Sequence, residues 1–188
     1  THKGYIKRTA ANTYRTQRRG GRGVQGAMSK EEDFVEHLFI ANTHNYMLFF
    51  TDKGKCYWLK VYDIPQGGRA ARGRAIVNLI GCEPNEKVEA FVSVKEFDDK
   101  HYIVMATQKG IVKKTVLSAY GKPRKGGIYA IEIREGDKLI EARISNGDHD
   151  ILLGTSEGKS IRFSENDIRP SGRKTMGVKG IKLGSDGD

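Results

Sequence analysis

The chain has 188 residues, which suits one large domain or two small ones, and 37% of them are hydrophobic, enough to form a core. A formal charge of +10 favours a polyanionic partner, either nucleic acid or an anionic membrane. No apolar run reaches the ~18 residues of a membrane-spanning helix and no signal peptide opens the chain, so we expect no part embedded in a membrane. The abrupt start at THKGYIKR and end at GSDGD are typical of a fragment.

The first element in the chain, Thr-x-x-Gly followed by a basic, alternating stretch, recurs three more times. Its glycines are Gly4, Gly54, Gly110 and Gly158. A second glycine follows each copy at a similar offset, and these are Gly23, Gly73, Gly127 and Gly177. Copies spaced about fifty residues apart are typical of propeller blades or a similar array. We therefore divide the chain into repeat units at 1–32, 33–85, 86–136 and 137–188.

The residue pattern of each unit predicts four short strands. Apolar runs that end at a turn signal are expected to form strands at 46–51, 102–107 and 151–155. Strands that follow these turns are expected at 55–62 and 159–163, and strands that follow the second glycine at 75–79, 128–133 and 178–183. Alternating strands are expected before the next apolar run, at 33–41, 87–94 and 138–144. No long stretch has helical periodicity, and we predict an all-β, propeller-like array of four-stranded blades.

Charge repeats with the same period. Residues 1–30 and 109–127 contain Lys and Arg but no Asp or Glu, and 53–79 and 159–182 also have a large basic excess. Each basic segment covers the interval between the first and second glycine of a unit, and acidic segments lie between them. Corresponding segments of a radial array occupy corresponding places. The basic segments are therefore predicted to line one rim of the array.

Each basic segment places Arg or Lys beside Gly, which predicts phosphate binding. Arginine presents a planar fork that suits phosphate, and glycine lets backbone N–H groups approach closely. A solvated loop would explain one such segment but not four in register. Aromatic residues are sparse there, which favours a duplex backbone over stacked single strands. The candidate DNA-binding residues are Gln17, Arg18, Arg19, Gly20, Gly21, Arg22, Gly23, Arg69, Arg72, Arg74, Lys122, Arg124, Lys125, Arg173 and Lys174.

Motifs for catalysis or metal binding do not emerge. Residues 21–26 match Gly-x-Gly-x-x-Gly, but no apolar strand precedes them and no helical pattern follows, so no dinucleotide site is predicted. The histidines lack metal-ligand spacing. Cys56 and Cys82 are predicted to be reduced, partly buried thiols.

The stretch QRRGGRG at 17–23 resembles the seven-residue box of the C-terminal domain of the DNA gyrase A family. GYIKRT before it, and VMATQKGIVKKTVL and GVKGIKLG further on, also resemble that family. Arg22 stands where the family often has lysine, which keeps the positive charge. The resemblance implies a six-bladed β-pinwheel, whose neighbouring blades exchange strands and whose basic rim wraps duplex DNA nearly independently of sequence.

The resemblance further implies a place in a bacterial, cytoplasmic, nucleoid-associated enzyme. That enzyme is an ATP-dependent type II topoisomerase, a heterotetramer of gyrase A and gyrase B polypeptides that introduces negative supercoils. The domain would be its non-catalytic DNA-binding part and would need no cofactor itself, since ATP and Mg²⁺ would act elsewhere in the holoenzyme. The chain has only about four repeat units, fewer than six blades. Two alternatives stay open: the equivalent domain of topoisomerase IV, whose box is degenerate, and a propeller-like protein-interaction scaffold.

Overall fold

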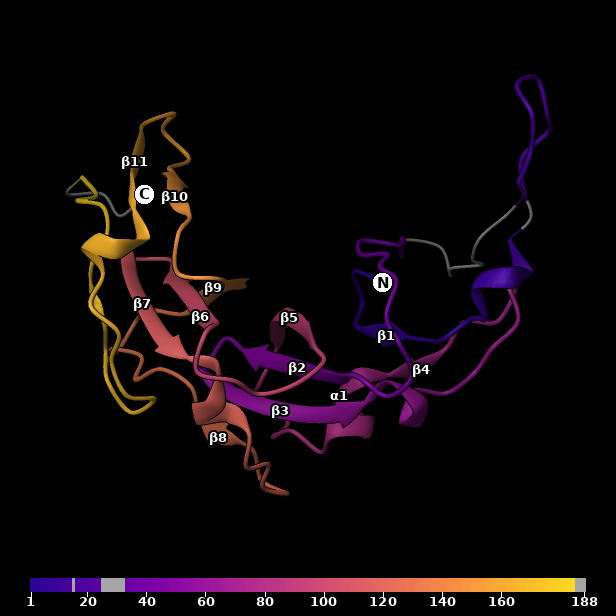
Figure 1. The fold of residues 1–188 in the computed structure, drawn as a ribbon, viewed down its shortest axis with the longest axis horizontal. Coiled ribbons are helices and arrows are strands. Elements are labelled where there is room, and N and C mark those ends of the chain that lie inside the picture. Colours follow the sequence, from indigo (N-terminus) through magenta and orange to yellow (C-terminus); the bar gives the residue numbers. More distant parts are fainter. Residues whose placement is uncertain (15, 25–32, 185–188) are drawn as a thin grey trace.

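The computed structural model describes residues 1–14, 16–24 and 33–184, and these form an open arc of small antiparallel sheets (Figure 1). The predicted all-β, blade-like architecture is confirmed. Helical segments in the described residues are short: α1 (Ile76–Ile80) and the 3-10 helices η1 (Ala11–Thr13), η2 (Val61–Asp63), η3 (Leu117–Tyr120) and η4 (Glu165–Asp167). None of them has the length or the hydrophobicity to cross a membrane.

Two four-stranded sheets form the middle of the arc. The strand order of the first is β5 (Val88–Val94), β2 (Tyr46–Thr51), β3 (Lys55–Lys60) and β8 (Ile128–Tyr129). The order of the second is β9 (Leu139–Ser145), β6 (Tyr102–Thr107), β7 (Ile111–Val116) and β12 (Val178–Lys179). Both orders run from the concave, inner side of the arc to its outer edge (Figure 1).

A two-stranded sheet lies toward each end of the arc (Figure 1). Their strands are β1 (Tyr5–Ile6) with β4 (Arg74–Ala75), and β10 (Asp150–Gly154) with β11 (Ser160–Ser164). The two complete sheets share their register: Phe49 of β2 lies between Tyr57 and Phe91, and Met105 of β6 lies between Lys113 and Ala142. This agreement confirms that the sequence repeat is also a structural one.

The outer strand of each complete sheet comes from the following repeat. Strand β8 lies beyond β6 and β7 in the chain yet pairs with β3, and β12 lies beyond β10 and β11 yet pairs with β7. Strand β4, which follows the hairpin of β2 and β3, pairs in the same way with β1. Neighbouring blades therefore exchange strands, as the resemblance implied.

The repeated glycines make this exchange possible. Gly54, in the turn between β2 and β3, has φ of 75°, and its carbonyl accepts the N–H groups of Ala130 and Ile131 at 2.8 and 3.2 Å. A Cβ atom on Gly54 would lie 2.4 Å from the Ile131 carbonyl oxygen. Gly177, before β12, has φ of 89°, and a Cβ there would lie 2.4 Å from the Val112 oxygen. Side chains at either position would separate the exchanged strand from its neighbour.

The hydrophobic core lies on both faces of the first complete sheet. Leu48 and Phe50 of β2 are fully buried in a cluster with Ile103 and Met105 of β6, which joins the two four-stranded sheets. Met47 and Phe49 project to the other face, into a second cluster. Each such side chain stabilises the fold by about 1.5–3 kcal/mol. Burial on both faces explains why β2 is a continuous apolar run rather than an alternating one.

One predicted strand is absent from the described residues: 33–41 pairs with no other strand, and Leu38 and Ile40 are 89% and 94% exposed. In the complete sheets the corresponding strands, β5 and β9, pair with β2 and β6, the first strands of their hairpins. The described residues contain only β1 at the equivalent hairpin, so 33–41 has no strand beside it. The prediction of a strand there was wrong for this structural reason.

The strands predicted after the second glycine are shorter than expected. The segment 75–79 enters β4 only at Ala75 and then turns into α1. Ile76 and Ile80, four residues apart on one face of α1, join the second core cluster, and Gly81 ends the helix in a left-handed conformation. A four-residue apolar spacing can serve a helix turn as well as a strand, which explains the error.

Candidate nucleic-acid interface

Four basic loops carry the predicted DNA-binding residues except Arg74, which lies in β4. We call 16–24 the box loop, and 66–73, 121–127 and 168–177 the second, third and fourth loops. Each of the last three directly precedes an exchanged strand, β4, β8 or β12, and so lies at the outer edge of the arc. The box loop projects away from the sheets at the N-terminal end of the arc (Figure 1). The loops are thus spaced along the arc rather than gathered in one pocket.

The box loop is closed by its own residues. The N–H of Gly23 donates to Gln17 Oε1 at 2.8 Å, and the N–H of Gly21 donates to the carbonyl of Arg18 at 2.9 Å. A Cβ atom on Gly21 would lie 2.9 Å from Gln17 Oε1, and Gly20 and Gly23 have φ of 84° and 69°. The geometry favours a loop-fixing role for Gln17, and it explains why glycines alternate with the arginines.

The basic side chains of these loops lack acidic partners. Within the described residues, no Asp or Glu lies at ion-pair distance from the predicted cations of the box loop (Arg18, Arg19 and Arg22), or from Arg69, Arg72, Arg74, Lys122, Arg124, Lys125, Arg173 and Lys174. The ion pairs that do form use other cations, such as Lys55 with Glu86 and Arg162 with Asp150. Cations without acidic partners thus recur from loop to loop, and a concentration of positive charge of this kind favours a polyanionic partner.

Two of the predicted cations turn toward the protein. The Arg72 guanidinium lies over the ring of Tyr5, with its Cζ 3.9 Å from the ring centroid, and Arg173 donates to the carbonyl of Tyr129 at 3.4 Å. Both side chains are half-buried, whereas Arg69, Arg74 and Lys174 are exposed. Arg72 and Arg173 therefore help to build their loops, and their exposed neighbours offer the freer charges.

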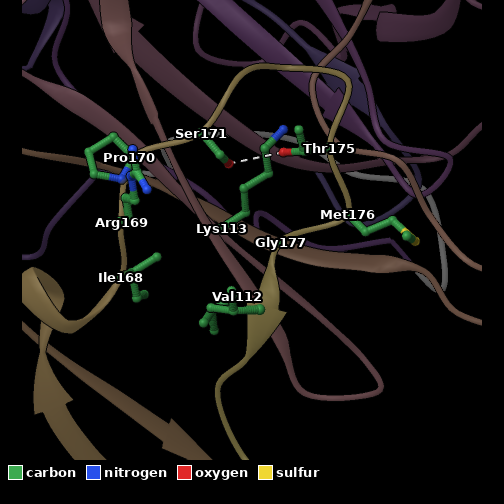
Figure 2. Close-up of a pocket in the computed structure, with 10 residues that line it drawn as sticks. Val112, Lys113, Ile168, Arg169, Pro170, Ser171, Thr175, Met176 and Gly177 are labelled. Carbon is green, nitrogen blue, oxygen red and sulfur yellow. Dashed lines mark hydrogen bonds between the residues drawn. The ribbon is translucent and has the colours of Figure 1, made fainter.

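The fourth loop lines a groove of about 490 Å³. Figure 2 shows its lining, in which Ser171 Oγ and Thr175 Oγ1 are hydrogen-bonded at 2.9 Å. Thr175 Oγ1 also donates to the Gly172 carbonyl at 2.8 Å, which braces the loop across its tip. Arg169 and Lys113 line the groove too. Sequence reasoning missed both, although Arg169 lies in the same basic segment as Arg173.

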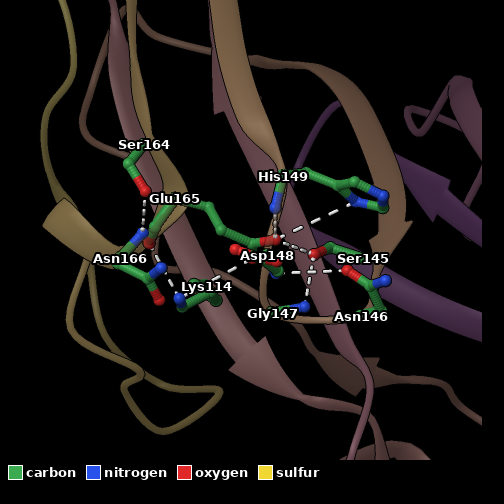
Figure 3. A network of polar contacts seen from close by, with 9 residues as sticks. All are labelled: Lys114, Ser145, Asn146, Gly147, Asp148, His149, Ser164, Glu165 and Asn166. Carbon is green, nitrogen blue, oxygen red and sulfur yellow. Dashed lines mark hydrogen bonds and ion pairs between the residues drawn. The ribbon is translucent and has the colours of Figure 1, made fainter.

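A buried polar network anchors the start of the fourth loop (Figure 3). Glu165 of η4 is fully buried, and its carboxylate accepts hydrogen bonds from Ser145 Oγ and, at 2.7 Å, from the N–H of His149. Lys114 donates to the Glu165 carbonyl at 2.7 Å. Burial alone would raise the pKa of the Glu165 carboxyl. The hydrogen bonds from Ser145 and His149, together with the charge of Lys114, outweigh burial and lower this pKa. Helix η4 is thereby held against β7 and β9.

Side chains that bind metal ions do not gather in the described part of the chain. It contains no group of three or more His, Cys, Asp or Glu residues that could hold a metal ion. Cys56 and Cys82 are free thiols. Cys82 is half-buried, as predicted, whereas Cys56 is fully buried.

Exchanged strands, together with basic loops that lack acidic partners, define a β-pinwheel with cation-rich loops. The model of the DNA gyrase C-terminal domain, a β-propeller family, matches residues 1–42, 45–95, 101–146 and 149–188, and the chain belongs to this family.

Curated relatives of the chain are DNA gyrase A polypeptides. The chain is 54% identical over 180 residues to the DNA gyrase A polypeptide of Clostridium acetobutylicum and 45% identical over 188 residues to that of Mycolicibacterium smegmatis. These matches cover 96% and 99% of this chain but 22% of each relative, so the chain spans about a fifth of their length.

Two solved structures share the fold. A DNA topoisomerase IV C-terminal domain matches with a TM-score of 0.81 at 27% identity, over 97% of this chain and 55% of that one. A DNA gyrase A C-terminal domain matches with a TM-score of 0.73 at 25% identity, over 97% and 59%. The fold is thus common to both enzymes, and the family model and the named relatives favour gyrase.

Proposed function

We propose that this chain binds duplex DNA along its outer edge and bends it, as the DNA-wrapping part of a DNA gyrase. The observation that carries the proposal is the set of basic loops without acidic partners, repeated at each blade. Protein–DNA affinity comes largely from phosphate contacts that release counterions, and loop cations free of internal ion pairs are available for them.

The arc supplies the geometry for wrapping. Bending 20–30 base pairs smoothly by 40–90° costs on the order of 1–6 kcal/mol. Cations spaced along a curved protein edge offset this cost only when the duplex follows the curve. Because the loops offer exposed charges and glycine backbone rather than an element shaped to enter a groove, binding should be nearly independent of sequence.

In the whole enzyme, a wrapped duplex would present a crossing of fixed hand to the DNA-cleaving site. We propose that this chain so enables negative supercoiling, together with the remainder of the gyrase A polypeptide and with gyrase B. ATP and Mg²⁺ would act in those other parts, and the assembly would work on the chromosome in the bacterial cytoplasm.

The test is a gel-shift titration of linear duplex DNA at two salt concentrations. We expect the affinity to fall steeply with salt, and the variant with Arg18, Arg19 and Arg22 replaced by alanine to lose up to ~3 units of the log–log salt slope, about one per lost phosphate contact. Replacement of Lys53, Lys87 and Lys159 by alanine removes the same charge from side chains paired with acids, and should leave the slope nearly unchanged. A salt-insensitive affinity would favour the protein-interaction scaffold instead.

A further inference from the structure

Two lysines reach from one repeat into a basic loop of the next. Lys113 of β7 is fully buried, and its Nζ donates to the carbonyls of Ala130 and Arg173 at 2.6 and 2.5 Å. Lys7, directly after β1, donates to the carbonyls of Gly68 and Arg69 at 3.0 and 2.5 Å. In both cases one of the two accepting carbonyls belongs to an arginine of a basic loop.

The two contacts occupy the same repeat positions. Lys7 and Lys113 each stand three residues after the first glycine of their unit, Gly4 and Gly110. Arg69 and Arg173 each stand four residues before the second glycine of the following unit, Gly73 and Gly177. An arrangement that recurs at symmetry-related positions is a property of the fold rather than an accident of one loop.

The residue that follows this position in each repeat makes a second recurring contact. Arg8 donates to the Ile64 carbonyl at 3.2 Å, Trp58 to the Tyr120 carbonyl at 2.9 Å, and Lys114 to the Glu165 carbonyl at 2.7 Å. These contacts hold the segments that lead into the second, third and fourth loops. A pair of adjacent side chains thus holds the second and fourth loops at two points.

Structural needs alone do not require a lysine at this position. Tyr57 occupies it in the middle repeat, and its hydroxyl donates to Glu86 and not to a carbonyl of the third loop. Within the described residues Lys113 has no acidic partner, and a buried cation without one is costly. Its ammonium group directs its hydrogen bonds to backbone carbonyls, one of them in a loop whose exposed charges face solvent.

We propose that Lys7 and Lys113 are positioning residues for DNA binding: each ammonium group fixes the peptide of Arg69 or Arg173, so that the basic loop presents its free cations in one arrangement. This inference rests on the proposed function. It also places the two lysines behind the DNA-facing surface, where they act through the loops and not by touching phosphate.

The experiment compares Lys7→Met and Lys113→Met in this chain with the parent and with Lys138→Met. The last variant removes the same charge from an exposed side chain outside the basic loops. Amide hydrogen exchange reports loop order without DNA. We expect exchange at least tenfold faster in the second loop of Lys7→Met and in the fourth loop of Lys113→Met, and unchanged exchange in Lys138→Met.

Fluorescence anisotropy then measures affinity for linear duplex DNA. We expect each methionine variant to bind at least threefold more weakly than Lys138→Met, and Lys7→Arg, which keeps the hydrogen-bond donors, to keep both loop order and affinity. Lys7 is only half-buried, so Lys7→Met decides the matter if circular dichroism shows that Lys113→Met does not fold. Loops that stay ordered, or affinities equal to that of Lys138→Met, would overturn the inference. A parent chain that does not bind DNA would instead overturn the proposed function.

Discussion

Lys113 shows how a single side chain links burial, charge and loop position. Its burial, with the nearby charge of Arg173, lowers the pKa of Lys113 from 10.5 to about 8. At a pH between these two pKa values, Lys113 keeps its proton in the unfolded chain but has lost it in the folded chain. The free energy of unfolding therefore gains a term from Lys113 that rises with pH across this window.

Urea denaturation at several pH values tests this effect. We expect the free energy of unfolding of the parent, relative to Lys113→Met, to increase as the pH rises from about 8 to 10.5, by up to about 1.4 kcal/mol per pH unit. A parent curve parallel to that of Lys113→Met would show that Lys113 titrates normally.

At the scale of single residues, the sequence predicts which side chains are exposed but not which of them contact another repeat. The alternation of Gly with Arg and Lys was enough to predict exposed box-loop arginines. The contact of Arg72 with Tyr5 and that of Lys113 with Arg173 join residues about sixty positions apart, from different repeats. Such pairings depend on strand exchange, which leaves no local pattern in the chain.

At the scale of elements, the junction between blades is the part least tolerant of change. Gly177→Ala would combine a left-handed backbone with a Cβ atom 2.4 Å from a neighbouring carbonyl, and we expect a cost of about 1–3 kcal/mol or more and loss of the β7–β12 pairing. Gly172→Ala, five residues earlier in the same loop, meets nothing within 4 Å and serves as the control. Thermal unfolding distinguishes them, and equal melting temperatures would contradict this account of the junction.

Strands and helices, like single residues, could be predicted where their contacts are local but not where they depend on another repeat. Strands whose neighbours lie in the same hairpin, such as β2, β3 and β6, were predicted almost residue for residue from apolar runs and turns. The segments 33–41 and 75–79 were not, because their conformation depends on which strand of another repeat is available to pair. Periodicity describes the faces of a segment, but it contains no information about its partners.

At the scale of the whole molecule, the four basic loops follow one another along the arc, and the box loop is the first of them. In an intact gyrase, we expect alanine at Arg18, Arg19 and Arg22 to reduce negative supercoiling more than ATP-driven relaxation of positive supercoils or decatenation, since wrapping is lost while cleavage is kept. The enzyme with alanine at Lys53, Lys87 and Lys159 is the matched control. If the box variant supercoils like the parent, the box is a solvated loop.

Strand exchange also decides where a mechanical load on the molecule goes. The second, third and fourth loops each continue directly into a two-residue outer strand that pairs with a strand of the preceding repeat. A pull on a loop, such as a bent duplex would exert, is therefore borne by the neighbouring blade as well as by its own. Tension applied at one of these loops would pass from blade to blade through the exchanged strands. No single loop would then carry the whole load of a bent duplex.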